Sequence, residues 1–334
     1  MKNPLHSLIA KLSKTRILVL GDFILDEYLF GEISRISREA PVLILKYQET
    51  RTAAGGGANT VANVAALGAE VVPVGFIGDD EAAGRLLDCW PSSVNHRYVF
   101  RDGSLQTTRK VRLLAGSFHS FRQQVVRLDY ENPAALTAAQ EDRLIETLTS
   151  LVPEVDALLL SDYSLGNLSE AVRESALRLA SEAGKILVVD SRDHPDLYAG
   201  ATSITPNITE IEAALSLSIG KDPAALEETG FRLLREWNLK ALLVTRGRLG
   251  MSLFTGGEAA HIPICGTDEV VDVTGAGDTV MAVYGTALAA GASYREAALL
   301  ANCAAGTVVT KRGTAAVSPE ELVRAADAAP GVSK

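Results

Sequence analysis

Five short apolar segments alternate with longer segments of helical periodicity, and this alternation constrains the fold more than any other feature. The apolar segments are rich in Val, Leu and Ile and are bounded by Gly, Asp or Ser, as expected for strands buried on both faces of a sheet. The expected strands are 17–21, 71–77, 157–160, 186–190 and 241–245. The expected helices are 59–67, 138–151, 169–183, 223–237 and 278–290. Because parallel strands are joined by right-handed crossovers, we expect an α/β fold with a mostly parallel sheet flanked by helices.

Two further segments, 27–50 and 97–129, break this alternation and are expected to add β-structure. They flank a glycine-rich segment, so they would form a small β-lid that excludes water from a site. The alternative is that they extend an edge of the main sheet. Since no repeat or linker interrupts the chain, we expect a single domain over residues 1–334.

Charge and composition exclude several classes of function. The net charge of −9 disfavours a nucleic-acid partner, which requires a basic face, but allows a small anionic ligand. Uninterrupted apolar segments of membrane-spanning length are absent, so no membrane partner is expected. The three cysteines, Cys89, Cys265 and Cys303, lack the spacing of a zinc site or of a disulfide framework, which favours a reducing cytoplasm.

The most specific motif is the segment 271–279, which runs into an apolar helix. Gly275 and Gly277 permit close approach of a ligand, and the first amides of the helix would form an anion site for a phosphoryl group. Asp278 is then placed to accept the proton of an attacking hydroxyl. The alternative is that Asp278 only caps the helix.

A second glycine-rich segment includes Gly55, Gly56 and Gly57 and precedes Asn59. Three consecutive glycines are costly in backbone entropy, so close approach of a ligand explains them better than a simple turn does. Asn59 would then bind a sugar hydroxyl. A hinge for the lid is the alternative, and the two interpretations are compatible.

Acidic and amide side chains follow other expected strands. Asp22 and Asp26 come just after the strand 17–21, where ligands of open α/β sheets bind, and they would accept bonds from vicinal hydroxyls or cap local turns. Asn207 and Glu210 would hold water around a magnesium–phosphate complex, or they would simply start a helix. The motifs of P-loop and dinucleotide-binding proteins are absent.

Together, Gly55 to Asn59, the pair Asn207 and Glu210, and the segment 272–278 resemble the motifs of ribokinase-type (PfkB) carbohydrate kinases. Within that family, the segments 21–28, 34–42, 127–129, 160–163, 243–246, 250–253 and 311–319 look like those of the D-glycero-β-D-manno-heptose 7-phosphate kinases of lipopolysaccharide core synthesis. The resemblance implies a ribokinase-like fold and transfer of a phosphoryl group from ATP to the anomeric hydroxyl of a heptose 7-phosphate. It also implies a homodimer formed through the lid. Some relatives continue into a nucleotidyltransferase domain, which we do not expect in this chain.

The resemblance assigns roles to individual residues. Asp278 would be the base, and Gly275, Ala276 and Gly277 the anion hole. The sugar phosphate would contact Asp22, Asp26, Gly56, Gly57 and Asn59, while cations of the lid segments, Arg35, Lys110 and Arg112 (with Arg38), would neutralise its distal phosphate. ATP would contact Asn207, Glu210, Arg192, Thr245, Gly247, Thr274 and Asn302, with Glu210 also serving Mg²⁺ through water.

Two positions depart from the heptose-kinase pattern. Leu165 stands where those enzymes usually carry a lysine, and Asp190-Ser191-Arg192 replaces Asp-Pro-Lys. Arg192 keeps the charge but not the shape of the side chain. Two alternatives therefore stay open: a kinase for another sugar, sugar phosphate or nucleoside, and a non-catalytic sugar-binding regulator.

Overall fold

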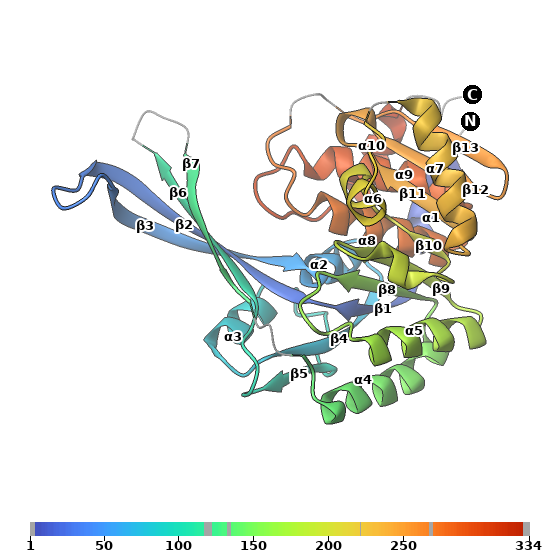
Figure 1. Cartoon of the computed structure of the whole chain (residues 1–334), viewed down its shortest axis with the longest axis horizontal. Helices are drawn as coiled ribbons and strands as arrows, with labels where there is room; N and C mark the ends of the chain where they lie inside the picture. The colour runs from blue at the N-terminus through green and yellow to red at the C-terminus, as the bar shows by residue number, and fades with distance from the viewer. Residues whose placement is uncertain (1–3, 117–121, 132–134, 221, 267–269, 330–334) are drawn as a thin grey trace.

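A nine-stranded, mostly parallel sheet forms the centre of the molecule (Figure 1). The computed structural model describes residues 4–116, 122–131, 135–220, 222–266 and 270–329. The strands, in their spatial order, are β13 (Glu258–Ile262), β12 (Met251–Thr255), β11 (Ala241–Thr245), β10 (Ser203–Ile204), β9 (Ile186–Ser191), β8 (Ala157–Asp162), β1 (Arg16–Gly21), β4 (Glu70–Gly78) and β5 (Val99–Asp102). Only the pairs β11–β12 and β12–β13 are antiparallel. The predicted α/β fold with a mostly parallel sheet is confirmed.

The predicted small β-lid is a separate four-stranded sheet that projects from the body as an arm (Figure 1). Its order is β3 (Leu43–Gly56), β2 (Phe23–Ile36), β6 (Arg109–Gly116) and β7 (Gln123–Tyr130). The boundaries differ from those expected: β5 pairs with β4 in the main sheet, so the alternative of an extended edge holds for this short strand. Part of the expected lid segment, residues 117–121, lies outside the described residues.

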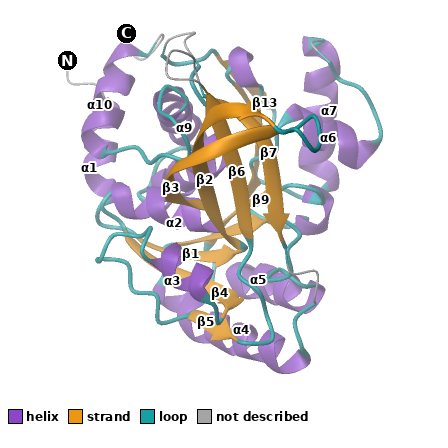
Figure 2. Cartoon of the chain, turned by 90° about the vertical axis from the view of Figure 1, so that its left-hand side faces the viewer, coloured by secondary structure: helices purple, strands orange, loops and turns teal. Residues whose placement is uncertain are grey.

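Helices cover both faces of the large sheet, because successive residues of its strands point to opposite sides. Ile17 and Val19 of β1 join one apolar core, and Leu18 and Leu20 join the other. The first core includes α1 (Pro4–Leu12), α2 (Gly57–Ala66), α3 (Glu81–Leu87), α8 (Ala276–Ala289), α9 (Tyr294–Val308) and α10 (Pro319–Ala328). The second includes α4 (Ala138–Leu151), α5 (Glu170–Glu182), α6 (Ile208–Leu215) and α7 (Pro223–Glu236). Figure 2 shows α1, α9 and α10 on one side and α6 and α7 on the other. Over the described part of the chain, none of the helices has the length and hydropathy needed to cross a membrane.

Helix α8 packs directly on the strands of the large sheet, which fixes the position of its N-terminal turn. Its residues from Asp278 to Leu288 are all buried. The closest approach is at Gly285, where a Cβ atom would lie 2.2 Å from Cδ2 of Leu159 in β8. An alanine at this position would therefore force the Leu159 side chain, or α8 itself, to move.

We predict that Gly285→Ala destabilises the protein, because overpacking a tight helix–sheet contact typically costs about 1–3 kcal/mol. The matched control is Gly84→Ala in α3, where an added Cβ meets no atom within 4 Å. That substitution should increase stability by up to about 1 kcal/mol, since alanine has the higher helix propensity. Urea unfolding of both variants measures the two effects, and equal changes would contradict the packing argument.

Candidate active site

Three cavities lie next to one another at the carboxyl edge of the large sheet. The basic pocket, of about 120 Å³, is lined by Asp26, Lys110, Arg112, Arg127 and Asp278, among others. The acidic pocket, of about 310 Å³, shares Tyr163 and Arg192 with the basic pocket. The apolar pocket, of about 360 Å³, shares Thr245 and Gly277 with the acidic one. The three cavities thus form a row that runs from the base of the arm to α9.

Asp278 lies in the first turn of α8, beside the basic pocket, and its side chain is buried. Its Oδ2 accepts a hydrogen bond from Asn59 Nδ2 at 3.0 Å, and its Oδ1 accepts one from the Tyr163 hydroxyl at 2.8 Å. Burial raises the pKa of Asp278 to about 7, with the nearby Asp190 adding to the shift and the two hydrogen bonds opposing it. The carboxyl group therefore titrates near neutral pH, which suits a general base.

The turn before Asp278 is built around Gly275, the N-cap of α8, which has a left-handed backbone with φ of 76°. A Cβ atom there would lie 2.4 Å from Asn59 Nδ2, so no other residue fits without displacing Asn59. Gly277 lines both the acidic and the apolar pockets, as a residue of an anion hole would. The Ala276 amide donates to the Val273 carbonyl at 3.2 Å, so in this structure it is not free to bind a phosphoryl oxygen.

Asn59, expected to bind a sugar hydroxyl, is hydrogen-bonded within the protein at both ends of its amide. Its Nδ2 donates to Asp278 Oδ2 and to the Gly275 carbonyl, and its Oδ1 accepts a bond from Asn63 Nδ2 at 3.1 Å. Asn59 therefore ties the start of α2 to the start of α8. In this structure its contribution is to hold Asp278.

The basic pocket gathers cations from the arm and the body: Lys110, Arg112, Arg127 and Arg192. Arg112 Nη1 contacts Asp26 Oδ1 at 2.5 Å, and Arg127 Nε contacts Asp129 Oδ1 at 2.9 Å, so two of these four charges are paired. Lys110 is buried, and both burial and the positive charge of Arg192 lower the pKa of its ammonium group. Such a surplus of positive charge is suited to an anionic group.

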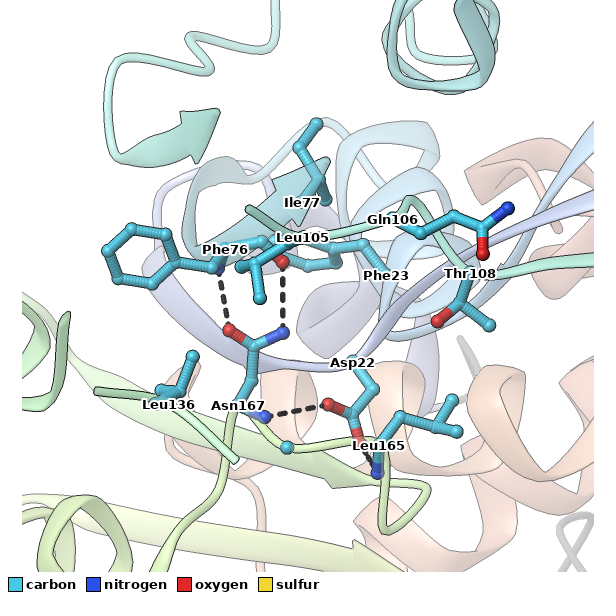
Figure 3. A pocket seen from close by; sticks show the side chains of 11 residues that line it. Asp22, Phe23, Phe76, Ile77, Leu105, Gln106, Thr108, Leu136, Leu165 and Asn167 are labelled. Carbon is cyan, nitrogen blue, oxygen red and sulfur yellow. Dashed lines mark hydrogen bonds between the residues drawn. The ribbon is translucent and has the colours of Figure 1, made fainter. Parts of the chain in front are cut away.

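Other residues expected at the substrate lie in different places. Gly56 lines the basic pocket, and the Gly57 amide donates to the Asp22 carbonyl at 2.9 Å. Arg35 is exposed near the far end of β2 and does not line the basic pocket of its own chain. Asp22 borders a separate small cavity of about 30 Å³ (Figure 3), where its carboxylate accepts bonds from the backbone amides of residues 163, 165 and 167.

The acidic pocket contains Asp190 and Glu210. Asn207 and Glu210 form the expected helix start, in which each side chain bonds the other's backbone amide. Burial raises the pKa values of both Asp190 and Glu210; the charge of Glu210 adds to the shift at Asp190, and the charge of Asp193 adds to the shift at Glu210. A cation bound near these two carboxyl groups would stabilise their charged forms and offset the cost of ionising both.

Within the described residues, no group of three His, Cys, Asp or Glu side chains is arranged to hold a metal ion. A Mg²⁺ ion in the acidic pocket would therefore take most of its ligands from water and phosphate oxygens, as this ion commonly does. The single carboxylates of Asp190 and Glu210 fit that arrangement.

The apolar pocket is suited to a nucleoside. Val273, Val280 and Ile264 contribute apolar surface, and Thr245, Gly247 and Asn302 lie on its lining as expected. Asn302 Nδ2 donates to the Pro263 carbonyl at 2.7 Å, which fixes the orientation of its amide. Thr274, also expected near ATP, instead lines the basic pocket.

Sequence reasoning gave no site role to Tyr163, Arg127 or Asp190, although all three line the pockets. Arg127 lies in the segment 127–129 that resembles the heptose kinases, but it was given no role, and it is brought to the pocket by the pairing of β7 with β6. Leu165, which replaces a lysine of the heptose-kinase pattern, borders the small cavity beside Asp22.

Solved structures with similar folds include Arabidopsis thaliana ribokinase, described as complexed with ribose and ATP. It has a TM-score of 0.72 and 20% identity, over 93% of this chain and 98% of the ribokinase chain. Phosphofructokinase-2 from Escherichia coli, in complex with potassium, has a TM-score of 0.74 and 18% identity, over 94% and 98% of the two chains. At these identities the likeness shows the fold, which is ribokinase-like.

Closer relatives include the "Bifunctional protein HldE" of Desulfatibacillum aliphaticivorans, 40% identical over 95% of this chain, and that of Chromohalobacter salexigens, 43% identical over 94%. The chain spans about 64% of the length of each of these proteins. The model of the pfkB family of carbohydrate kinases matches residues 14–321. The match includes Asp278 and the residues that hold it, and the chain belongs to the pfkB carbohydrate kinase family.

Proposed function

We propose that the protein is an ATP- and Mg²⁺-dependent kinase that phosphorylates D-glycero-β-D-manno-heptose 7-phosphate at its anomeric hydroxyl, giving the 1,7-bisphosphate. The observation that carries this proposal is the position of Asp278 beside the basic pocket, which adjoins the acidic pocket. A sugar phosphate in the basic pocket and the phosphates of ATP in the acidic pocket would meet at this carboxylate.

In the proposed reaction, Asp278 accepts the proton of the anomeric hydroxyl while the oxygen of that hydroxyl attacks the γ-phosphorus of ATP. The bond between the γ-phosphorus and the bridging oxygen breaks, and ADP leaves. The Gly275 and Gly277 amides at the positive end of α8 stabilise the charge on the transferred group. Bound Mg²⁺, near Asp190 and Glu210, would neutralise phosphate charge.

The charge of the basic pocket supports a phosphorylated substrate over a neutral sugar or nucleoside. Four cations line it, and Asp26 and Asp129 offset two of them, Arg112 and Arg127. The choice of a heptose rests on the resemblance to heptose 7-phosphate kinases and on the relatives named HldE. The position of Leu165 outside the basic pocket is compatible with this choice.

The first test is Mg²⁺- and ATP-dependent ADP release with heptose 7-phosphate, fructose phosphates, ribose and nucleosides. We expect selective release with heptose 7-phosphate, and a loss of about 10²–10⁴-fold in Asp278→Asn, the range typical of general-base catalysis. Circular dichroism checks that the variant folds. Release with another sugar would contradict the heptose assignment, and no release with any sugar would favour a sugar-binding regulator.

A second prediction concerns the phosphate of the substrate. Lys110→Gln should raise KM for the sugar phosphate by roughly 10–100-fold, since a hydrogen bond to a charged group contributes about 1.5–3 kcal/mol, while KM for ATP changes little. The matched control is Arg35→Gln on the arm, which should leave both constants unchanged. An effect of Arg35→Gln on KM for the sugar phosphate would indicate that the arm reaches a site on another copy of the chain.

We also propose a homodimer formed through the arm, in the cytoplasm. The arm exposes Ile36, Val42, Tyr47, Val126 and Leu128, an apolar set that a second copy would cover. Light scattering should therefore give twice the monomer mass, and Val126→Asp combined with Leu128→Asp should give the monomer. A monomeric wild-type protein at micromolar concentration would contradict the proposal.

A further inference from the structure

Tyr163 stands at the boundary between the basic and the acidic pockets, and the reaction described above gives it no role. It directly follows β8, and its side chain lines both pockets. Its hydroxyl donates to Asp278 Oδ1 at 2.8 Å, whereas Asn59 occupies Oδ2. The two oxygens of the carboxylate are thus held by different neutral donors.

The backbone that carries Tyr163 is fixed by two buried carboxylates. Asp22 accepts bonds from the amides of Tyr163, Leu165 and Asn167 at 2.9, 3.0 and 3.1 Å. Asp162 Oδ1 accepts a bond from the Ser164 amide at 2.9 Å. Figure 3 shows the Asp22 carboxylate hydrogen-bonded to Leu165 and Asn167.

Ser164 adopts a left-handed backbone conformation with φ of 58°. Such a conformation costs energy for a residue other than glycine and persists only where the surroundings enforce it. Here four amides of residues 163–167 donate to Asp22 or Asp162. The loop is therefore a rigid support for the Tyr163 side chain, which gives its hydroxyl a defined direction.

The position of the Tyr163 ring is also constrained from the arm. Lys110 Nζ lies 5.6 Å from the centroid of the ring, within the range of a cation–π contact. Removing only the hydroxyl therefore leaves the ring, the loop and the Lys110 contact in place. The chemistry of the hydroxyl can be isolated from packing by a single substitution to phenylalanine.

We propose that Tyr163 is a positioning residue, which orients the carboxylate of Asp278 and stabilises its charged form through the hydrogen bond to Oδ1. Asn59 alone would hold one oxygen and leave the carboxylate free to rotate about the Cβ–Cγ bond. With both donors, the remaining lone pairs of Asp278 are directed at a fixed place between the pockets. The expected effect of Tyr163 on the rate of phosphoryl transfer rests on the proposed role of Asp278 as the base.

Several charged groups act on Asp278 besides Tyr163. Asp190 and Asp26, when ionised, oppose its ionisation. The cations of the basic pocket, which favour ionisation, come from β6, from β7 and from the segment after β9: Lys110, Arg112, Arg127 and Arg192. Because Tyr163→Phe alters none of these charges, any change in the titration of Asp278 reports the lost hydrogen bond.

The substrate-free test is a carbon-13 NMR titration of the aspartate carboxyl groups, with the Asp278 signal identified by its loss in Asp278→Asn. In Tyr163→Phe we expect the pKa of Asp278 to rise by about one unit above its value of about 7 in the unmodified chain. The matched control is Tyr198→Phe. Tyr198 is also buried and donates to a carboxylate, Asp162 Oδ2 at 2.7 Å, but it does not contact Asp278.

The kinetic test is the pH dependence of kcat/KM with heptose 7-phosphate. A base must be ionised, so activity falls as the pH drops below its pKa, and a raised pKa moves this acid limb to higher pH. Tyr163→Phe should lose about fivefold at pH 7 and recover towards the unmodified rate by pH 9. Tyr198→Phe should keep the acid limb of the unmodified enzyme.

The outcomes separate the two proposals. An unmoved Asp278 titration in Tyr163→Phe overturns the inference whatever the substrate proves to be. A moved titration with an unmoved acid limb and an active Asp278→Asn leaves the hydrogen bond established but overturns Asp278 as the base. A rate loss in Tyr163→Phe that is equal at all pH values would assign Tyr163 a structural role only.

Discussion

The cost of burying carboxylates governs the architecture of this site. Four aspartates near the carboxyl edge of the sheet, Asp22, Asp26, Asp162 and Asp278, are each no more than 7% exposed. An ionised carboxylate is expensive to bury unless donors surround it, and each of the four is satisfied differently. Asp22 accepts three backbone amides, Asp162 accepts two hydroxyls and an amide, Asp26 faces Arg112, and Asp278 is bonded by an amide and a phenol. Asp22 and Asp162, which hold loops in place, accept hydrogen bonds from backbone amides. Asp278 instead accepts hydrogen bonds from two neutral side chains and lies beside a cavity.

The fold was largely predictable from the sequence because its dominant signal is local. Strands buried on both faces require continuous apolar segments, and all five expected strands are present. The strand β10 was not predicted, since two residues carry too little pattern to distinguish it from a loop. The strand β5 lies inside the segment 97–129 that was expected to be β-structure, but its boundaries were not resolved from the sequence. The arm was anticipated as β-structure, but its division from the main sheet depends on pairing between distant segments, which a local pattern does not encode.

The position of Gly275 and Asp278 beside the pockets was predictable, because one short segment contains both the glycine turn and the carboxyl group. The site was not predictable where a contact joins distant segments. Asn59 has the residue type of a sugar ligand, yet its partners are fixed by the packing of α2 on α8. Arg35 and Arg127 are both arm cations, and the register of β6 with β7 brings only Arg127 to the pocket. Tyr163 lies in the segment 160–163 that resembles the heptose kinases, but a tyrosine after a strand is ordinarily a packing residue, so it was given no role.

The length of β2 has a mechanical consequence. This strand has 14 residues and runs from the floor of the basic pocket, at Ile24 and Asp26, to the far end of the arm. Near its base, Glu27 is clamped by Arg85 of α3 and Arg109 of β6. At about 3.3 Å per residue, the part of β2 from Glu27 to Ile36 is about 30 Å long, so a rotation of about 5° at the clamp would displace the end of the strand by about 2.5 Å. The same rotation would move Asp26 by only a small fraction of that distance. A rotation of the arm about the Glu27 clamp would therefore move the far end of the arm while Asp26, beside the clamp, kept its position relative to Asp278.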